Sequence, residues 1–191
     1  MKKPPANLPP ITDPLPSFTY HPDPFFTGAF ERTEAPCDAC RRLAPVIYAG
    51  PVFGDLDHQP TLCPWCIASG LAHERFGATF IDVESLDTLI PQPIADLLVE
   101  RTPFINTFQQ GHWPACCADA CTLVGPLSIA QFRERFREFE GSLLSHIIHD
   151  LGVSGRAALN LLESLQRDQS PALILFACRS CDSKKFHIDT L

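Results

Sequence analysis

Paired cysteines constrain this 191-residue chain more than any other feature of its sequence. Four close pairs recur along the chain, and they are Cys37 and Cys40, Cys63 and Cys66, Cys117 and Cys121, and Cys178 and Cys181. A structural zinc ion takes four thiolates in a tetrahedron, and a close pair on a tight turn supplies two of them. The spacing therefore predicts two structural zinc ions, each held by two pairs.

The first predicted site joins Cys37 and Cys40 to Cys63 and Cys66. The 22 residues between Cys40 and Cys63 fit a strand, a turn and a second strand, the layout of a zinc ribbon. The segment Cys63-Pro64-Trp65-Cys66 also resembles a thioredoxin-like redox motif that opens a helix. The flanking sequence lacks the strand–helix–strand pattern of that fold, so we favour zinc.

The second predicted site joins Cys117 and Cys121 to Cys178 and Cys181, across a gap of 56 residues after Cys121. Cys116 complicates the choice of ligands, because successive residues rarely both reach one ion. We expect one of the two to be a spare thiol and assign Cys117 to the site, and a pairing of Cys116 with Cys121 is the alternative. His112 could replace a cysteine and open the site for catalysis, although four cysteine ligands favour a structural role.

Hydrophobic spacing predicts an α+β fold, with zinc-ribbon-like knuckles, short antiparallel strands and an inserted helical hairpin at about 128–168. Strands are expected near 18–20, 46–48 and 79–83, and helices at 66–76 and 93–101. The strongest helical pattern covers 128–150, with Ser128 as N-cap. A second helix at 154–167 completes the hairpin, and strands at 172–178 and 185–188 flank the last cysteine pair. Residues 1–16 contain six prolines and predict an extended arm, followed by one domain over 17–191.

Composition narrows the classes of function. The formal net charge of −7 argues against a broad nucleic-acid surface and against docking on an anionic membrane. No apolar run is long enough for a membrane span and no signal peptide is visible. Nine cysteines without an export signal favour reduced, metal-bound thiols and a cytoplasmic location.

Three classes of function remain open from the residues alone. The first is a non-enzymatic zinc-binding module that engages a protein partner, and the acidic charge suits a basic one. The second is an enzyme whose site would gather His21, Asp23, Glu100 and Trp113 in one pocket. The third is nucleic-acid binding through the zinc ribbons, which the net charge disfavours. No sequence motif specifies a reaction, so we favour the first class.

Several segments together resemble the CbrC-like family of bacterial proteins. They are Phe18 to Phe30 with its Tyr-His-Pro-Asp-Pro core, Tyr48 to Phe53, Leu62 to Gly70, Glu100 to Pro103, Gln109 with Gln110, Trp113, and the final Cys178 and Cys181. In that family a histidine is typical at the position of Cys116, which implies that Cys117 is the ligand. Phe104 stands where the family has glycine. The resemblance implies a cytosolic bacterial protein with a link to colicin tolerance and no established reaction.

Overall fold

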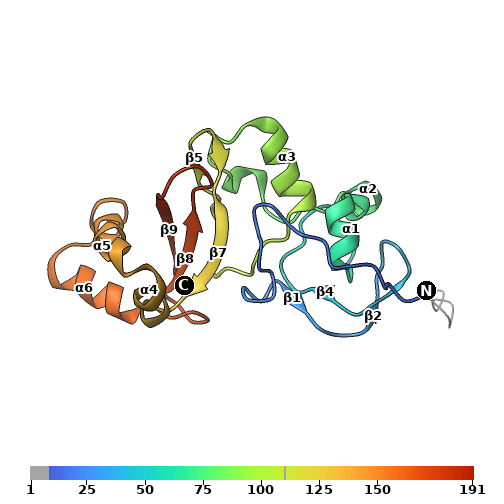
Figure 1. The fold of residues 1–191 in the computed structure, drawn as a ribbon, viewed down its shortest axis with the longest axis horizontal. Helices are drawn as coiled ribbons and strands as arrows, with labels where there is room; N and C mark the ends of the chain where they lie inside the picture. Colours follow the sequence, from blue (N-terminus) through green and yellow to red (C-terminus); the bar gives the residue numbers. More distant parts are fainter. Residues whose placement is uncertain (1–8, 110) are drawn as a thin grey trace.

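The computed structural model describes residues 9–109 and 111–191, and it has the mixture of helices and small antiparallel strands that the sequence predicts. Figure 1 shows an elongated molecule with short strands and helices α1 to α3 at one end. A three-stranded sheet lies in the middle, and helices α4 to α6 lie at the other end. The two parts of the molecule therefore meet across one central sheet.

Short antiparallel ladders build the first part of the chain. Strand β1 (Phe30–Glu31) pairs with β4 (Ile47–Tyr48), and β2 (Ala35–Pro36) pairs with β3 (Leu43–Ala44). The strand predicted at 46–48 is thus present. The strand predicted at 18–20 is a turn instead, and 79–83 contributes only one bridge between Phe53 and Thr79.

Gly70 divides the helix predicted at 66–76 into two. Helix α1 (Pro64–Ser69) ends at Gly70, whose φ of 81° lies in the left-handed region, and α2 (Leu71–Phe76) follows directly. Glycine adopts this conformation at little cost, so it ends the first helix and starts the second in a new direction. Helix α3 (Gln92–Arg101) forms as predicted, after a short 3-10 turn, η1 (Val83–Ser85).

The central sheet has the strand order β7-β8-β9 and is antiparallel throughout. Its strands are β7 (Thr122–Leu127), β8 (Ala172–Ala177) and β9 (Lys184–Asp189). The prediction of two strands flanking the last cysteine pair is confirmed. The structure adds β7, and it adds a small hairpin before it, β5 (Ala115–Cys116) with β6 (Asp119–Ala120).

Strand β8 contributes to two hydrophobic cores. Ile174 and Phe176 pack into the core of the first part of the chain, next to Trp113. Leu173 and Leu175 pack into a second core beneath the helices. Successive side chains of a strand point to opposite faces, so the apolar run of β8 covers both sides of the sheet at once.

The helical region replaces the predicted hairpin with three helices. Helix α4 (Ile129–Phe136) is followed by a 3-10 turn, η2 (Arg137–Phe139), then by α5 (Glu140–His149) and α6 (Gly155–Ser164). The helix expected at 128–150 is thus divided near its middle. Ser128 is its N-cap, as the pattern predicts, and the structure adds a capping box between Ser128 and Gln131.

Part of the proline-rich arm is described, and it is docked against the rest of the chain. The backbone N–H of Ile11 donates to the carbonyl of Leu43, and the Trp65 indole donates to the carbonyl of Pro14. Residues 9–16 are therefore attached to the chain near the first two cysteine pairs. The rest of the predicted arm, residues 1–8, lies outside the described residues, and the single-domain boundary at 17 stays a prediction.

Candidate metal centres

The first cysteine group unites the two pairs that the sequence placed in one site. Cys37 and Cys40 lie in the turn between β2 and β3, and Cys63 and Cys66 lie at the start of α1. The Sγ atoms of Cys37 and Cys66 are 3.7 Å apart, and those of Cys40 and Cys63 are 4.0 Å apart. All four sulfurs lie within 4.8 Å of one another.

These separations fit a metal site better than disulfides. Four sulfurs at about 2.3 Å from a tetrahedral zinc ion are about 3.8 Å from one another. A disulfide would bring two sulfurs to about 2.05 Å. All nine cysteines are free thiols in the structure. The first group therefore has the spacing of a tetrahedral site with four cysteine ligands.

A tight turn presents the first pair. The N–H of Arg41 donates to the Cys37 carbonyl, and the N–H of Cys37 donates to the Arg42 carbonyl. Arg41 has a φ of 61°, a conformation more common for glycine at this point of a turn. On the other side, Pro64 occupies the first turn of α1, and the N–H of Cys63 donates to the Cys37 sulfur. The backbone thus points all four thiols at one place.

The second group differs from the prediction in one cysteine. The sulfurs within 4.8 Å of one another belong to Cys116, Cys117, Cys178 and Cys181. The Cys116–Cys117 and Cys116–Cys181 sulfurs are 3.8 Å apart, and Cys117–Cys181 are 3.7 Å apart. The structure thus includes Cys116, which we expected to be a spare thiol, and it leaves out Cys121.

The hairpin β5–β6 explains how two successive cysteines reach one point. Cys116 pairs with Asp119 across a two-residue turn of Cys117 and Ala118, whose φ values are 54° and 58°. Two positive φ values define the type I′ turn of tight hairpins. In an extended strand the two side chains would point to opposite faces. The left-handed turn removes that alternation and brings Cys117 beside Cys116.

Cys121 lies between β6 and β7 and is fully buried. Its carbonyl accepts a hydrogen bond from the Trp113 indole at 2.7 Å, and burial raises the pKa of its thiol to about 12. It is therefore a core residue next to the second group. His112 does not join either cysteine group; its ring lies 6.5 Å from that of His187.

Crowding of the thiols shifts their pKa values in opposite directions. Contact with the Cys63 and Cys66 thiols lowers the pKa of Cys37, while contact with Cys37 raises those of Cys63 and Cys66. In the second group, hydrogen bonds from Ser183 lower the pKa of Cys181 to about 6. A divalent cation stabilises thiolates strongly enough for all four to ionise together. Both groups therefore have the donor chemistry that a zinc ion requires.

The two groups differ in exposure to solvent. Cys37, Cys63 and Cys66 are buried, with Cys37 and Cys63 at 0% relative exposure. In the second group Cys117 and Cys181 are exposed, and the other two cysteines are half-buried. An ion in the first group would lie inside the protein, and an ion in the second would lie at its surface.

His21 and Trp113, two members of the candidate enzyme site, are buried structural residues. The His21 ring is at 0% relative exposure, with Nδ1 2.7 Å from the Pro103 carbonyl and Nε2 2.7 Å from the Thr27 hydroxyl. A carbonyl only accepts, so Nδ1 carries the proton. Trp113 is fully buried and hydrogen-bonded to Cys121.

The other two members lie elsewhere. The Asp23 carboxylate accepts from the N–H of Phe26 within an exposed turn, and Glu100 lies on α3 with its carboxylate 3.4 Å from His73. None of the pockets described for residues 9–109 and 111–191 is lined by two of the four residues. The convergence that an enzyme site required is therefore not found.

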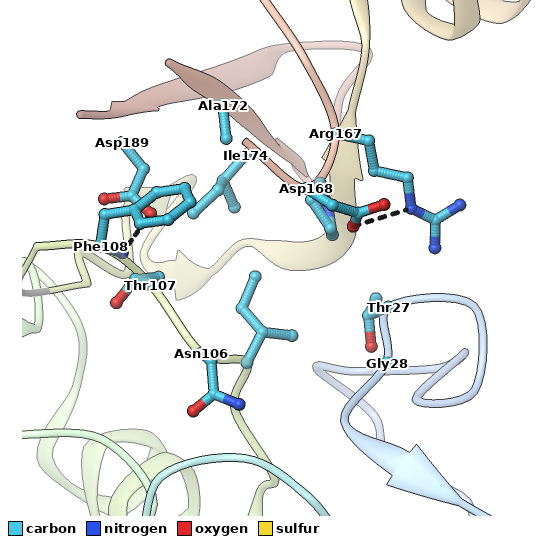
Figure 2. Close-up of a pocket in the computed structure, with 12 residues that line it drawn as sticks. Thr27, Gly28, Asn106, Thr107, Phe108, Arg167, Asp168, Ala172, Ile174 and Asp189 are labelled. Atoms are coloured by element: carbon cyan, nitrogen blue, oxygen red, sulfur yellow. Dashed lines mark hydrogen bonds and ion pairs between the residues drawn. The ribbon is translucent and has the colours of Figure 1, made fainter. Parts of the chain in front are cut away.

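A pocket of about 280 Å³ lies where the loop 105–108 meets β8 and β9 (Figure 2). Its charged groups already have partners. The Asp189 carboxylate accepts from the backbone N–H groups of Phe108 and Gln109 at 2.7 and 2.8 Å. Arg167 forms an ion pair with Asp168 at 3.7 Å, and it also donates to the Phe26 carbonyl. Figure 2 marks this ion pair with a dashed line. These charged groups thus hold the loop 105–108 and the segment around Arg167 against the rest of the protein.

The fold and the two groups define an α+β protein with two sets of four clustered cysteines. The chain belongs to the uncharacterised protein family UPF0167, whose model matches residues 15–190. It is similar to the UPF0167 protein PA1536 of Pseudomonas aeruginosa, at 31% identity over 94% of this chain and 99% of that protein. It is also similar to the UPF0167 proteins Mb2317 of Mycobacterium bovis and MT2352 of Mycobacterium tuberculosis. Each is 36% identical over 61% of this chain and 63% of its own length.

No solved structure matches the chain. Among the described residues, every helix is too short or too polar to cross a bilayer.

Proposed function

We propose that this protein binds two structural zinc ions and acts as a non-enzymatic protein-interaction module. The observation that carries the zinc proposal is the arrangement of eight sulfurs in two sets, with separations of 3.7 to 4.0 Å between the measured pairs. This spacing suits a tetrahedral ion with four thiolate ligands. Four protein ligands leave no open position for a substrate, which favours a structural role.

The interaction role is supported by the positions of the candidate catalytic residues and of the first cysteine group. The candidate catalytic residues are dispersed, and the first metal centre is enclosed in the core. We propose that the partner is a protein, and the net charge of −7 favours a basic partner for the surface as a whole. The resemblance to CbrC-like proteins supports a role in toxin tolerance. Nine free thiols favour a reducing compartment, and we propose the cytoplasm.

The test is the metal content of protein purified without added metal. Elemental analysis is expected to give two zinc ions per chain, and cobalt substitution is expected to give the thiolate charge-transfer bands of a tetrahedral site. Cys116→Ala is expected to lose one ion, while the matched variant Cys121→Ala retains both. A wild-type protein without metal, or a loss of one ion in Cys121→Ala alone, would contradict the assignment.

A further inference from the structure

Strand β9 lies at the edge of the central sheet and has an open side. It pairs with β8 on one side, and no strand or isolated bridge among the described residues pairs with the other. At its end, the Asp189 carboxylate accepts from the backbone N–H groups of the loop at 108–109. An open edge presents unpaired N–H and C=O groups that can template another strand.

A groove of about 620 Å³ runs along this edge. Five consecutive residues of β9, Lys184 to Ile188, line it. A pocket over one face of a sheet would meet alternate residues, so a continuous run places the groove along the strand edge. Helix α5 forms one wall, with His146 and His149, and the segment 112–115 forms the other. In Figure 1, β9 is the dark red strand at the side of the sheet toward α5.

Basic side chains are concentrated in the groove, although the protein as a whole is acidic. The groove is lined by two lysines and four histidines, namely Lys184, Lys185, His112, His146, His149 and His187. Among the described residues neither lysine forms an ion pair with a carboxylate. The two carboxylates that line the groove are already engaged. Asp87 accepts from the N–H groups of Leu89 and Ala115, and Asp150 contacts His146.

Two imidazole nitrogens of the groove also lack partners. Nε2 of His146 and Nε2 of His187 are buried and have no hydrogen-bond partner among the described residues. Buried polar atoms without partners are rare in folded proteins, and each one costs stability. A bound segment that supplies hydrogen-bonding partners to these nitrogens would offset this cost.

We propose that the groove binds an extended acidic peptide segment of a partner protein, which adds a strand to the outer edge of β9. The register of β9 specifies the pattern of that segment. Lys185 and His187 lie on one face of the sheet, where their cross-strand partners are Phe176 and Ile174. Phe186 lies on the other face, and its partner is Leu175. Strand neighbours pair on the same face, so acidic residues alternate with apolar residues in the segment. The groove thus suits an acidic segment, whereas the net charge of the whole protein suits a basic partner.

The test uses the full zinc-loaded chain and a fluorescein-labelled heptapeptide that alternates glutamate with valine. Fluorescence anisotropy is expected to show saturable binding that weakens in high salt. Lys185→Glu is expected to weaken binding at least about tenfold, which corresponds to about 1.4 kcal/mol. Arg156→Glu is the matched control, because Arg156 is exposed on α6 outside the groove, and it is expected to bind normally. Lys185→Ala provides a milder variant if the charge reversal disturbs folding.

A second peptide separates strand addition from simple anion binding. Methylation of alternate backbone nitrogens removes the N–H groups that a strand donates, and it is expected to abolish binding. Amide hydrogen exchange within 184–188 is expected to slow when the unmodified peptide binds. Equal binding of the methylated peptide, or equal competition by free glutamate, would show an anion pocket and overturn the proposal. The inference rests on the proposed function, because it states what kind of segment the proposed interaction module binds. No peptide binding by protein that holds two zinc ions would overturn it and leave the zinc proposal intact.

Discussion

Cys117 and Ala118 show how much a single backbone conformation decides in this protein. Both have positive φ values, and their turn brings two successive cysteines to one group. Residues other than glycine adopt this conformation at a cost of about 1–2 kcal/mol each. The sequence Cys-Ala gives no sign of it, because type I′ turns usually carry asparagine and glycine. Spacing alone therefore grouped Cys121 with Cys117, whereas the structure places Cys116 beside Cys117.

Ala118→Gly is expected to stabilise the protein by roughly 0.5 kcal/mol. The substitution removes the crowding of the Ala118 Cβ, and the greater freedom of glycine in the unfolded chain offsets part of the gain. Urea unfolding measures the difference. Ala157→Gly in the exposed face of α6 is the control and is expected to destabilise the protein by about 1 kcal/mol. A loss of stability in Ala118→Gly would contradict the strain argument.

His21 is expected to make stability depend on pH below neutrality. Burial lowers its pKa from 6.5 to about 4. The unfolded chain therefore binds a proton that the folded protein does not between these values. The free energy of unfolding falls as the pH decreases through this window, at up to about 1.4 kcal/mol per pH unit.

The measurement compares urea unfolding of the wild type and His21→Gln between pH 7 and 5, with the metal content checked at each pH. The wild type is expected to lose more stability than the variant on acidification. An NMR titration of the wild type provides an independent readout, with the His21 ring neutral at pH 5. Parallel stability curves together with a normal His21 titration would show that the burial argument is wrong.

At the scale of elements, the sequence predicted correctly the helices and strands that are determined by neighbouring residues, such as an N-cap or a short apolar run. Ser128 was correctly expected to begin a helix, and the strands around Cys178 and Cys181 were correctly paired. The spacing of Phe132, Leu143 and their apolar neighbours suits one long helix or two short ones equally well. The turn at η2 therefore could not be predicted from periodicity. Strand β7 contains Gly125 and Pro126, which are rare in strands, and tertiary pairing with β8 overrides that preference.

The capping box of α4 provides a test at this scale. Ser128→Ala is expected to cost about 1 kcal/mol, because the N–H of Gln131 loses its acceptor at the helix start. Ser154→Ala is the matched control, since Ser154 is the N-cap of α6 but makes no capping hydrogen bond. Chemical denaturation of both variants measures the difference. Equal losses in the two variants would mean that the Ser128 hydrogen bond contributes nothing specific.

At the scale of the whole molecule, the two cysteine groups are expected to release metal at different rates. The first group is buried, while Cys117 and Cys181 of the second are exposed. A chelator reaches the exposed thiolates directly but must wait for local opening at the buried group. Zinc release is therefore expected to be biphasic, with one ion lost quickly. The variant Cys117→Ala is expected to keep only the slow phase, and a single phase in the wild type would contradict this order.

The two faces of β8 have a consequence for how the molecule unfolds. Leu173 and Leu175 cover one core, and Ile174 and Phe176 cover the other. If either half melted, the sheet would expose the apolar face that this half had buried, and the surviving half would retain β8 with one side in water. Neither half is a self-sufficient unit in this arrangement. With both ions bound, the strand couples the halves into one cooperative transition, although Figure 1 shows them as separate lobes on either side of the sheet.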